Sequence, residues 1–369
     1  MNNIMSILFA SDYESKLAEL AIHRTTGSIP FGGRYRLIDF TLSNLVNSGI
    51  TSIGIITKNN YQSLMDHIRM GRDWNLNRKN TGLTIFPPNF LSSGEGFKNK
   101  IDSLKTVMNY VKDRREEYVA VSNCNVIYNL DYDKVFDFHI ARGADITMLT
   151  YTGATNSCRR VLVTKNDEDR VDNIYVSTTS GAKEREIGLN IYLLKKDILE
   201  AIIDEAFAGG LVDFEKEVLL PKLNSLRICA YAVEGYAAII DDVKTYYYES
   251  RKLLDSEIRE ELFNAYGKIY TKVKDSVPTV YGKSAVIENS LIADGCRING
   301  TVINSILFRG VTVDSDAVIK DSIIMENGYI MKNSSVAYTI TDKNVIIMDG
   351  RNISGYETYP IVIAKNKIV

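Results

Sequence analysis

Side chains able to do acid–base, nucleophilic or metal chemistry are sparse in this sequence. Only three histidines occur, His23, His67 and His139, so more than half of the chain contains no imidazole base. The cysteines form no Cys-x-x-Cys pair and are scattered at Cys124, Cys158, Cys229 and Cys296. This spacing fits neither a zinc site nor a disulfide framework, and it favours a reduced, intracellular setting.

Charge and composition exclude several further classes of protein. The 369 residues carry 44 Lys+Arg against 46 Asp+Glu, a formal net charge of −2, with no long basic run. Binding to nucleic acid or to a membrane surface is therefore not expected. The opening MNNIMSILFAS lacks a basic segment, and its apolar run is too short for a signal peptide or a membrane span. We expect a cytoplasmic protein of two or three domains.

The elements that must position any site alternate between strand-like and helix-like patterns up to about residue 242. Strands are predicted at Met5–Ala10, Ser52–Thr57 and Tyr118–Ser122, and helices at Leu37–Ser48 and Ser103–Arg114. Asp102 is a plausible N-cap for the second of these helices. Such alternation predicts right-handed βαβ units and an α/β domain over residues 1–242, with a mainly parallel sheet.

The remaining residues follow two other patterns. Residues 243–277 are charged, Tyr-rich and helical, and we interpret them as a connector; the alternative is one more surface helix of the first domain. Over residues 278–369, aliphatic residues recur every six positions, with small turn-forming residues between them. The positions are Val286, Ile292 and Ile298, then after a two-residue slip Ile306, Thr312, Val318, Ile324, Ile330 and Val336, and after another slip Ile340 and Ile346. This period predicts a parallel β-helix with one inward residue per flat face.

An α/β domain followed by a hexapeptide coil suggests two kinds of enzyme. A hexapeptide acyltransferase needs a histidine base on the coil, and none follows His139. The segment PFGGRYRLIDF at residues 30–40 instead strongly resembles ADP-glucose pyrophosphorylase (glucose-1-phosphate adenylyltransferase). Further matches run in order along essentially the whole chain, at Ile127-Tyr128, Asp131-Tyr132, Ile191-Tyr192, Asp213-Phe214, Asp242-Val243 and Ala285-Val286. The resemblance implies a Rossmann-like nucleotidyltransferase domain, a left-handed β-helix, and a reaction of ATP with glucose-1-phosphate that uses magnesium.

The catalytic positions implied by this resemblance depart from the family's pattern. The glycine-rich loop that cradles the triphosphate falls on Ser11–Leu17, where no glycine remains and Asp12 and Glu14 would repel phosphate. The family's loop arginine becomes Lys16, its Lys-Pro lysine becomes Thr26, and its magnesium aspartate becomes Asn125. Only the second acidic position, Asp242, is retained, and it could equally be a helix N-cap. Together these losses are expected to remove on the order of 10⁵ in rate.

The resemblance therefore implies a chain without its own catalysis, metal or cofactor, closest to the D-type, non-catalytic branch of the family. Such a chain would modulate a catalytic subunit in a hetero-tetramer, and the magnesium would belong to that partner. Remnants of substrate contacts are expected at Asp102, Gly188, Asp213 and Lys216. Phosphorylated or nucleotide effectors are expected at Arg34 and Arg36, although these could be surface cations and Gly32-Gly33 only a turn. The alternatives are a slow nucleotidyltransferase that acts alone and a homo-oligomeric sugar-phosphate or nucleotide sensor.

Overall fold

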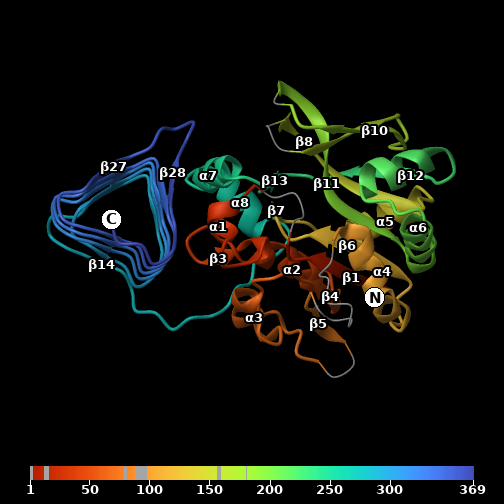
Figure 1. The fold of residues 1–369 in the computed structure, drawn as a ribbon, viewed down its shortest axis with the longest axis horizontal. Helices are drawn as coiled ribbons and strands as arrows, with labels where there is room; N and C mark the ends of the chain where they lie inside the picture. The colour runs from red at the N-terminus through yellow and green to blue at the C-terminus, as the bar shows by residue number, and fades with distance from the viewer. Residues whose placement is uncertain (1–2, 12–15, 79–80, 89–97, 156–158, 180) are drawn as a thin grey trace.

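The computed structural model describes residues 3–11, 16–78, 81–88, 98–155, 159–179 and 181–369. Figure 1 shows an α/β domain beside a triangular coil that is viewed down its axis, with a long segment connecting them. Among the described residues, no helix combines the length and the apolar character needed to cross a membrane.

The α/β domain is built on a nine-stranded sheet with the path order β10-β9-β11-β6-β1-β4-β5, to which β8 and β12 are added. Its central strands are parallel: β1 (Ile4–Phe9), β4 (Ser52–Ile56), β5 (Gly82–Phe86) and β6 (Tyr118–Asn123). All residues of β1, β4 and β6 are buried, as expected for strands with both faces covered.

Beyond β6 the sheet becomes antiparallel. The long strand β11 (Gly181–Lys195) pairs antiparallel with β6 and with β8 (Ile146–Thr155), and β9 (Arg160–Lys165) pairs antiparallel with β10 (Val171–Ser177). Only β12 (Ile228–Ala232) restores a parallel pair, with β8. The predicted fold class is confirmed, but the sheet is mixed, because β8 to β11 return without the crossover helices that parallel pairing requires.

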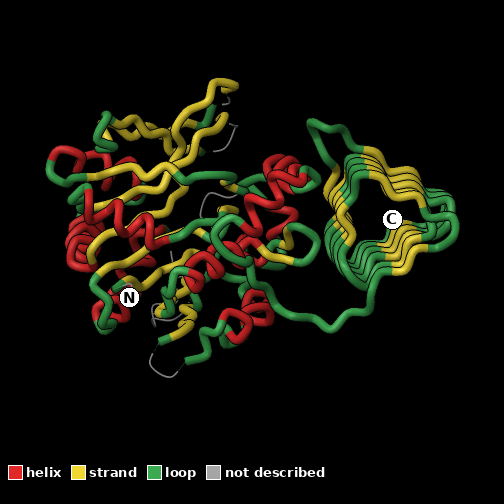
Figure 2. Tube along the Cα trace, turned by 180° about the vertical axis from the view of Figure 1, so that it is seen from behind, coloured by secondary structure: helices red, strands yellow, loops and turns green. Residues whose placement is uncertain are grey.

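Helices cover both faces of the sheet, as the view from behind shows (Figure 2). One apolar cluster includes residues of α2 (Leu37–Asn47), α3 (Gln62–Ile68) and α5 (Tyr132–Ala141). The other includes residues of α4 (Lys100–Lys112) and α6 (Lys196–Ala208). The shorter elements are α1 (Ala18–Ala21), η1 (Thr26–Ser28), η2 (Arg72–Trp74), η3 (Phe214–Leu219), η4 (Leu220–Asn224), β2 (Pro30–Phe31), β3 (Tyr35–Arg36), β7 (Val126–Tyr128) and β13 (Ala237–Ile239).

The start of α4 corrects one prediction. The helix begins at Lys100, and its N-cap is Asn99, whose Oδ1 accepts a hydrogen bond from the Asp102 amide at 2.9 Å. Asp102 therefore lies inside the first turn of α4. Its carboxylate interacts favourably with the positive end of the helix dipole but does not cap the helix.

Two helices, α7 (Val243–Lys252) and α8 (Ser256–Asn264), follow the α/β domain, and α7 lies against the β-helix. The Tyr246 hydroxyl donates to the Pro30 carbonyl at 2.7 Å, and the Tyr247 hydroxyl donates to the Asp321 carbonyl at 2.6 Å. One apolar cluster contains both tyrosines together with Ile306, Ile323 and Ile340 of the β-helix. The helix therefore joins the two parts of the chain through a continuous core.

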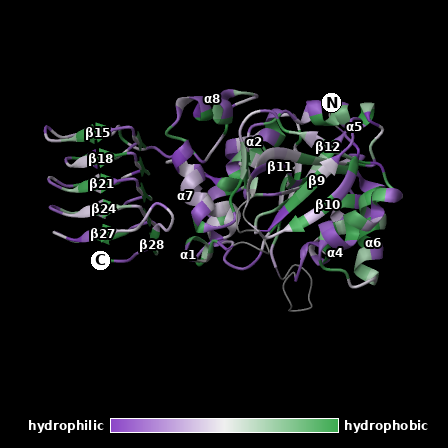
Figure 3. Cartoon of the chain, turned by 90° about the horizontal axis from the view of Figure 1, so that it is seen from above, coloured by the Kyte–Doolittle hydropathy of each residue, from purple (hydrophilic) through white to green (hydrophobic). Residues whose placement is uncertain are grey.

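The C-terminal region is a left-handed β-helix of three five-stranded parallel sheets, with coils stacked in register (Figure 3). The first sheet contains β14 (Val280–Tyr281), β17 (Arg297–Ile298), β20 (Thr312–Val313), β23 (Tyr329–Ile330) and β26 (Ile346–Ile347). The second contains β15 (Val286–Glu288), β18 (Thr301–Ile303), β21 (Val318–Lys320), β24 (Ser335–Ala337) and β27 (Asn352–Ser354). The third contains β16 (Leu291–Ile292), β19 (Ile306–Leu307), β22 (Ile323–Ile324), β25 (Thr339–Thr341) and β28 (Ile361–Ile363).

The six-residue phase identifies the β-helix but misplaces part of its interior. Ile298, Ile324, Ile330 and Val336 do lie inside the coil. Elsewhere the inward residues include Leu307, Val313, Ile319 and Ile347, each the neighbour of a predicted position, whereas Val286 is exposed. Most coils repeat after 17 residues, as in the pairing of Thr312 with Tyr329 and of Tyr329 with Ile346. A strict period of six therefore slips by one residue per turn.

Candidate functional site

Three of the positions that the resemblance assigns to catalysis meet beside residues 240–242, which follow β13. The Lys16 amide donates to the Asp241 carbonyl at 2.6 Å, and Lys16 forms an isolated bridge with Asp242. Asn125, almost completely buried, donates from Nδ2 to the Ile240 carbonyl at 3.1 Å. The structure thus brings together Lys16, Asn125 and Asp242, which lie far apart in the sequence. Thr26 is also buried, at the start of η1, while Asp12 and Glu14 lie outside the described residues.

The two consecutive carboxylates at this position are engaged by the protein itself. Asp242 is the N-cap of α7, because its Oδ1 accepts from the Thr245 amide at 2.6 Å and from the Thr245 hydroxyl at 2.7 Å. Asp241 forms a buried ion pair with Arg160 of β9, in which Arg160 Nη2 lies 3.1 Å from Asp241 Oδ1.

These residues do not fit a magnesium ion. A hard divalent cation needs several oxygen ligands, preferably carboxylates. Here one carboxylate caps a helix, one pairs with a guanidinium, and Asn125 turns its amide nitrogen to a carbonyl. Among the residues that the structure describes, no group of three or more His, Cys, Asp or Glu side chains is arranged to hold a metal.

A polar cavity of about 260 Å³ lies next to this point, with Asp241 in its wall. Glu215 of η3 is its most constrained group: it accepts from Lys100 Nζ at 3.0 Å, from Arg159 Nη2 at 3.0 Å and from the Tyr192 hydroxyl at 2.8 Å. Burial alone would raise the pKa of Glu215, but the adjacent Lys100 and Arg159 charges lower it to about 2. Two of the cations that line the cavity, Lys100 and Arg159, are therefore already paired with internal carboxylates.

The predicted substrate remnants are only partly assembled around this cavity. Asp213 lines it, caps η3 and accepts from Arg159 Nη2 at 2.8 Å. Asp102, Gly188 and Lys216 are not among its described lining residues: Gly188 is buried within β11, and Lys216 is exposed. Of the four predicted substrate remnants only Asp213 lines this cavity, and a substrate role for the others stays a prediction.

Sequence reasoning missed Lys100, Arg159, Asn190 and Glu215, which do line the cavity. A local signal was the Arg159-Arg160 pair at the start of β9. Asn190, at φ 57°, carries an Oδ1 that has no hydrogen-bond partner among the described residues. Neutral amides and paired charges suit a polar ligand such as a sugar better than a triphosphate.

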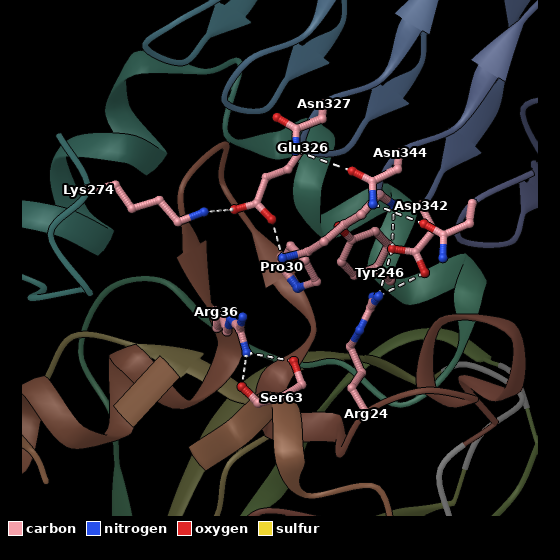
Figure 4. Close-up of polar contacts among 12 residues, drawn as sticks. Arg24, Pro30, Arg36, Ser63, Tyr246, Lys274, Glu326, Asn327, Asp342 and Asn344 are labelled. Atoms are coloured by element: carbon pink, nitrogen blue, oxygen red, sulfur yellow. Dashed lines mark hydrogen bonds and ion pairs between the residues drawn. The ribbon is translucent and has the colours of Figure 1, made fainter. Parts of the chain in front are cut away.

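A second cavity, of about 100 Å³, lies between the α/β domain and the β-helix, and we call it the cationic cleft (Figure 4). It contains both predicted effector residues. Its charged lining consists of Arg34, Arg36, Lys272, Lys274, Arg309, Lys343 and Glu326, and His67 also faces it. The turn before Arg34 requires glycine, since Gly32 and Gly33 have φ values of 59° and 85°.

The two predicted arginines differ in their surroundings. Arg36 Nη1 donates to the Ser63 carbonyl at 2.6 Å and to the Ser63 hydroxyl at 3.0 Å. Burial lowers the pKa of Arg36, and the charge of Glu326 opposes that shift. Arg34 is exposed, stacks over the Tyr35 ring at 5.0 Å and donates to the Tyr35 hydroxyl at 2.8 Å.

The β-helix contributes a column of charges to the cationic cleft. Arg309, Glu326 and Lys343 stand 17 residues apart, at the same corner of successive coils. Glu326 pairs with Lys343 and, at 3.3 Å, with Lys274 of the connecting segment. The coil repeat was the signal that could have revealed this column from the sequence, because a period of 17 places these side chains above one another.

Below the cleft, a buried ion pair joins the two parts of the chain. Arg24 Nη2 lies 2.8 Å from Asp342 Oδ1 and 2.9 Å from Oδ2, as Figure 4 shows. The two side chains are only 3% and 2% exposed. The pair therefore connects the α/β domain to the β-helix next to Lys343, which lines the cleft.

An α/β domain with a polar cavity beside residues 240–242, joined to a hexapeptide β-helix, defines a class: nucleotidyltransferase-type proteins with a C-terminal β-helix. Family profiles agree, since one described as "Nucleotidyl transferase" matches residues 6–206 and one described as "GlmU-like, C-terminal hexapeptide" matches residues 275–358.

Full-length relatives narrow the class. The glycogen biosynthesis protein GlgD of Bacillus subtilis (strain 168) is 32% identical over 367 residues, covering 100% of this chain and 97% of that protein. GlgD of Geobacillus stearothermophilus is 35% identical over 86% of this chain and 83% of its own length. A glucose-1-phosphate adenylyltransferase of Bacillus cytotoxicus is 31% identical over 95% of this chain and 94% of its own length. The chain belongs to the family of glucose-1-phosphate adenylyltransferases and GlgD proteins, as its sequence motifs predicted.

Proposed function

We propose that this chain is a regulatory, non-catalytic subunit of ADP-glucose pyrophosphorylase in glycogen biosynthesis. Its role would be to assemble with a catalytic subunit that makes ADP-glucose and pyrophosphate from ATP and glucose-1-phosphate. Similarity to two GlgD proteins and to a glucose-1-phosphate adenylyltransferase supports the pathway. The observation that carries the non-catalytic part is the engagement of Asp241 by Arg160 and of Asp242 by the N-terminus of α7.

The proposal assigns no metal or cofactor to this chain, and magnesium would be held by the catalytic partner. Restoring a site here would require breaking a buried ion pair and uncapping a helix, each of which costs stability. The protein is proposed to be cytoplasmic and to bind neither nucleic acid nor membrane, in line with its near-neutral charge.

Assembly into a hetero-tetramer is supported by the first coil of the β-helix. Strands β14, β15 and β16 each stand at the end of their sheet. Val280, Tyr281, Val286 and Ile287 on them are exposed. An apolar strand edge of this kind favours pairing with another chain.

Regulation is proposed to operate through the cationic cleft. Its excess of lysine and arginine side chains suits phosphorylated effectors, because guanidinium and ammonium groups bind phosphate oxygens. The cleft lies between the two parts of the chain, so a bound anion would contact both and bias their relative positions. The same observation supports the second candidate, a homo-oligomeric sugar-phosphate or nucleotide sensor.

The test is an assay of pyrophosphate release by the catalytic subunit alone and by that subunit mixed with this chain, with light scattering of the mixture. We expect a mixed oligomer whose activity or effector response differs from that of the catalytic subunit alone. If no mixed oligomer forms and the activity does not change, the regulatory role is refuted. The homo-oligomeric sensor is then the remaining candidate function.

A further inference from the structure

The cationic cleft carries more positive charge than its own carboxylates neutralise. Six Lys and Arg side chains line it against the single carboxylate of Glu326. Arg309 has an additional partner, Asp294, at 2.9 Å. Even with that pair counted, an excess of about four positive charges remains around a cavity of about 100 Å³. Unlike the paired charges around Glu215 in the polar cavity, the charges that line this cleft do not cancel one another.

The cations come from three separate segments that meet at the cleft. Arg34 and Arg36 belong to the β2–β3 hairpin, Lys272 and Lys274 to the segment between α8 and β14, and Arg309 and Lys343 to the β-helix. Glu326 contacts Lys343 and Lys274 directly, and its charge opposes the burial that lowers the pKa of Arg36. Its side chain is only 13% exposed.

We propose that Glu326 is a built-in anion at the phosphoryl position of the cationic cleft, and that a ligand must displace it to bind. This inference rests on the proposed regulatory role of the cleft and identifies the residue that sets its anion selectivity. The ligand class is a phosphoryl group carrying close to two negative charges, since it must replace a carboxylate held by two lysines. A phosphoryl group bound in place of the Glu326 carboxylate would then also contact other Lys and Arg side chains of the cleft.

The competing interpretation is that Glu326 only completes an alternating column of charges on the β-helix. Asp294, Arg309, Glu326 and Lys343 do alternate in sign along successive coils. Two contacts go beyond that column. Lys274, which pairs with Glu326, lies outside the β-helix, and so does Arg36, which lines the same cavity as Glu326. The two interpretations predict opposite effects of removing the carboxylate on phosphate binding.

The experiment compares wild-type protein with Glu326→Gln, which keeps the shape of the side chain and removes its charge. Binding of inorganic phosphate, glucose 1-phosphate and AMP is measured by calorimetry on the full-length chain in chloride buffer, with phosphate-induced thermal shifts in parallel. We expect Glu326→Gln to bind inorganic phosphate at least tenfold more tightly than wild type. The organic phosphate with the larger gain then identifies the source of the phosphoryl group.

Two further variants control the result. Glu288→Gln removes an exposed carboxylate on β15 of the same β-helix and should leave phosphate affinity unchanged. Adding Arg36→Ala to Glu326→Gln should abolish most of the gain. If Glu326→Gln does not fold, Glu326→Asp takes its place. A smaller gain in phosphate affinity is then expected, because the shorter side chain loses contact with one lysine.

Equal or weaker phosphate binding by the folded Glu326 variant would overturn the proposal. Because the measurement uses the isolated chain, that outcome is distinguishable from failure of the regulatory role. A chain that modulates its catalytic partner but gains no phosphate affinity would keep its function and lose only the role given to Glu326.

Discussion

Replacing Arg24 by methionine removes the guanidinium that joins the α/β domain to the β-helix while keeping an apolar stem. The variant leaves Asp342, only 2% exposed, without Arg24 Nη2, which contacts both of its carboxylate oxygens. Stranding one member of a buried ion pair typically costs about 3–5 kcal/mol. The Lys343 amide still donates to Asp342 Oδ1 at 2.7 Å, so we expect the lower end, about 3 kcal/mol.

Urea unfolding of the full-length chain measures this loss as a fall in the unfolding free energy. The matched control is Lys105→Met, which breaks a surface pair with Asp204 whose side chains are 39% and 46% exposed. That change should cost less than about 1 kcal/mol. Combining Arg24→Met with Asp342→Asn should recover part of the loss, because no charge is then left buried. A loss below about 1 kcal/mol for Arg24→Met would refute the view that this pair holds the two parts together.

Three further predictions concern the two sites. Asn125→Asp alone should not restore ADP-glucose synthesis, because Asp241 and Asp242 remain engaged; a hundredfold rise in pyrophosphate release would contradict this. Arg34→Ala in the mixed oligomer should alter the response to sugar phosphates and nucleotides without changing the oligomer's mass by light scattering, and unchanged activation curves would reduce Arg34 to a surface cation. Glu215, whose pKa falls from 4.5 to about 2 on folding, should contribute stability above about pH 4.5 that is lost as the pH falls towards 2. Its full contribution is about 3 kcal/mol, so the difference in unfolding free energy between wild type and Glu215→Gln should shrink on acidification, and a constant difference would disprove the assigned ion pairs.

The fold could be predicted where its signal is local. Buried strands such as Ile4–Phe9 and the repeating aliphatics of the coil each follow from a short window of sequence. The direction of the strands beyond β6 could not be predicted from the sequence, because β11 acquires its antiparallel neighbours only when β8 and β9 fold back on it. To predict which residues of the coil point inward, the repeat of 17 residues per coil would have been needed. Three periods of six give 18 residues and only approximate it.

For the candidate sites, too, some features could be predicted from the sequence and others could not. The departures from the family's catalytic pattern at Lys16, Thr26 and Asn125 are read from the sequence alone, and the loss of catalysis that they imply stays a prediction. The N-cap role of Asp242, one of its two expected alternatives, is confirmed. Pairs such as Arg24 with Asp342, however, are separated by 318 positions and carry no local pattern. The cationic cleft was predicted only through Arg34 and Arg36, because its other cations come from segments that meet only in the folded chain.

The central claim is that the isolated chain has lost catalysis, and its most direct test is steady-state pyrophosphate release by the purified protein with ATP, glucose-1-phosphate and magnesium. An ordinary enzyme turns over at about 10 s⁻¹. Losses on the order of 10⁵ predict a rate near or below ~10⁻⁴ s⁻¹ for this chain. A purified homo-oligomer that turns over at about 10 s⁻¹ would contradict the account.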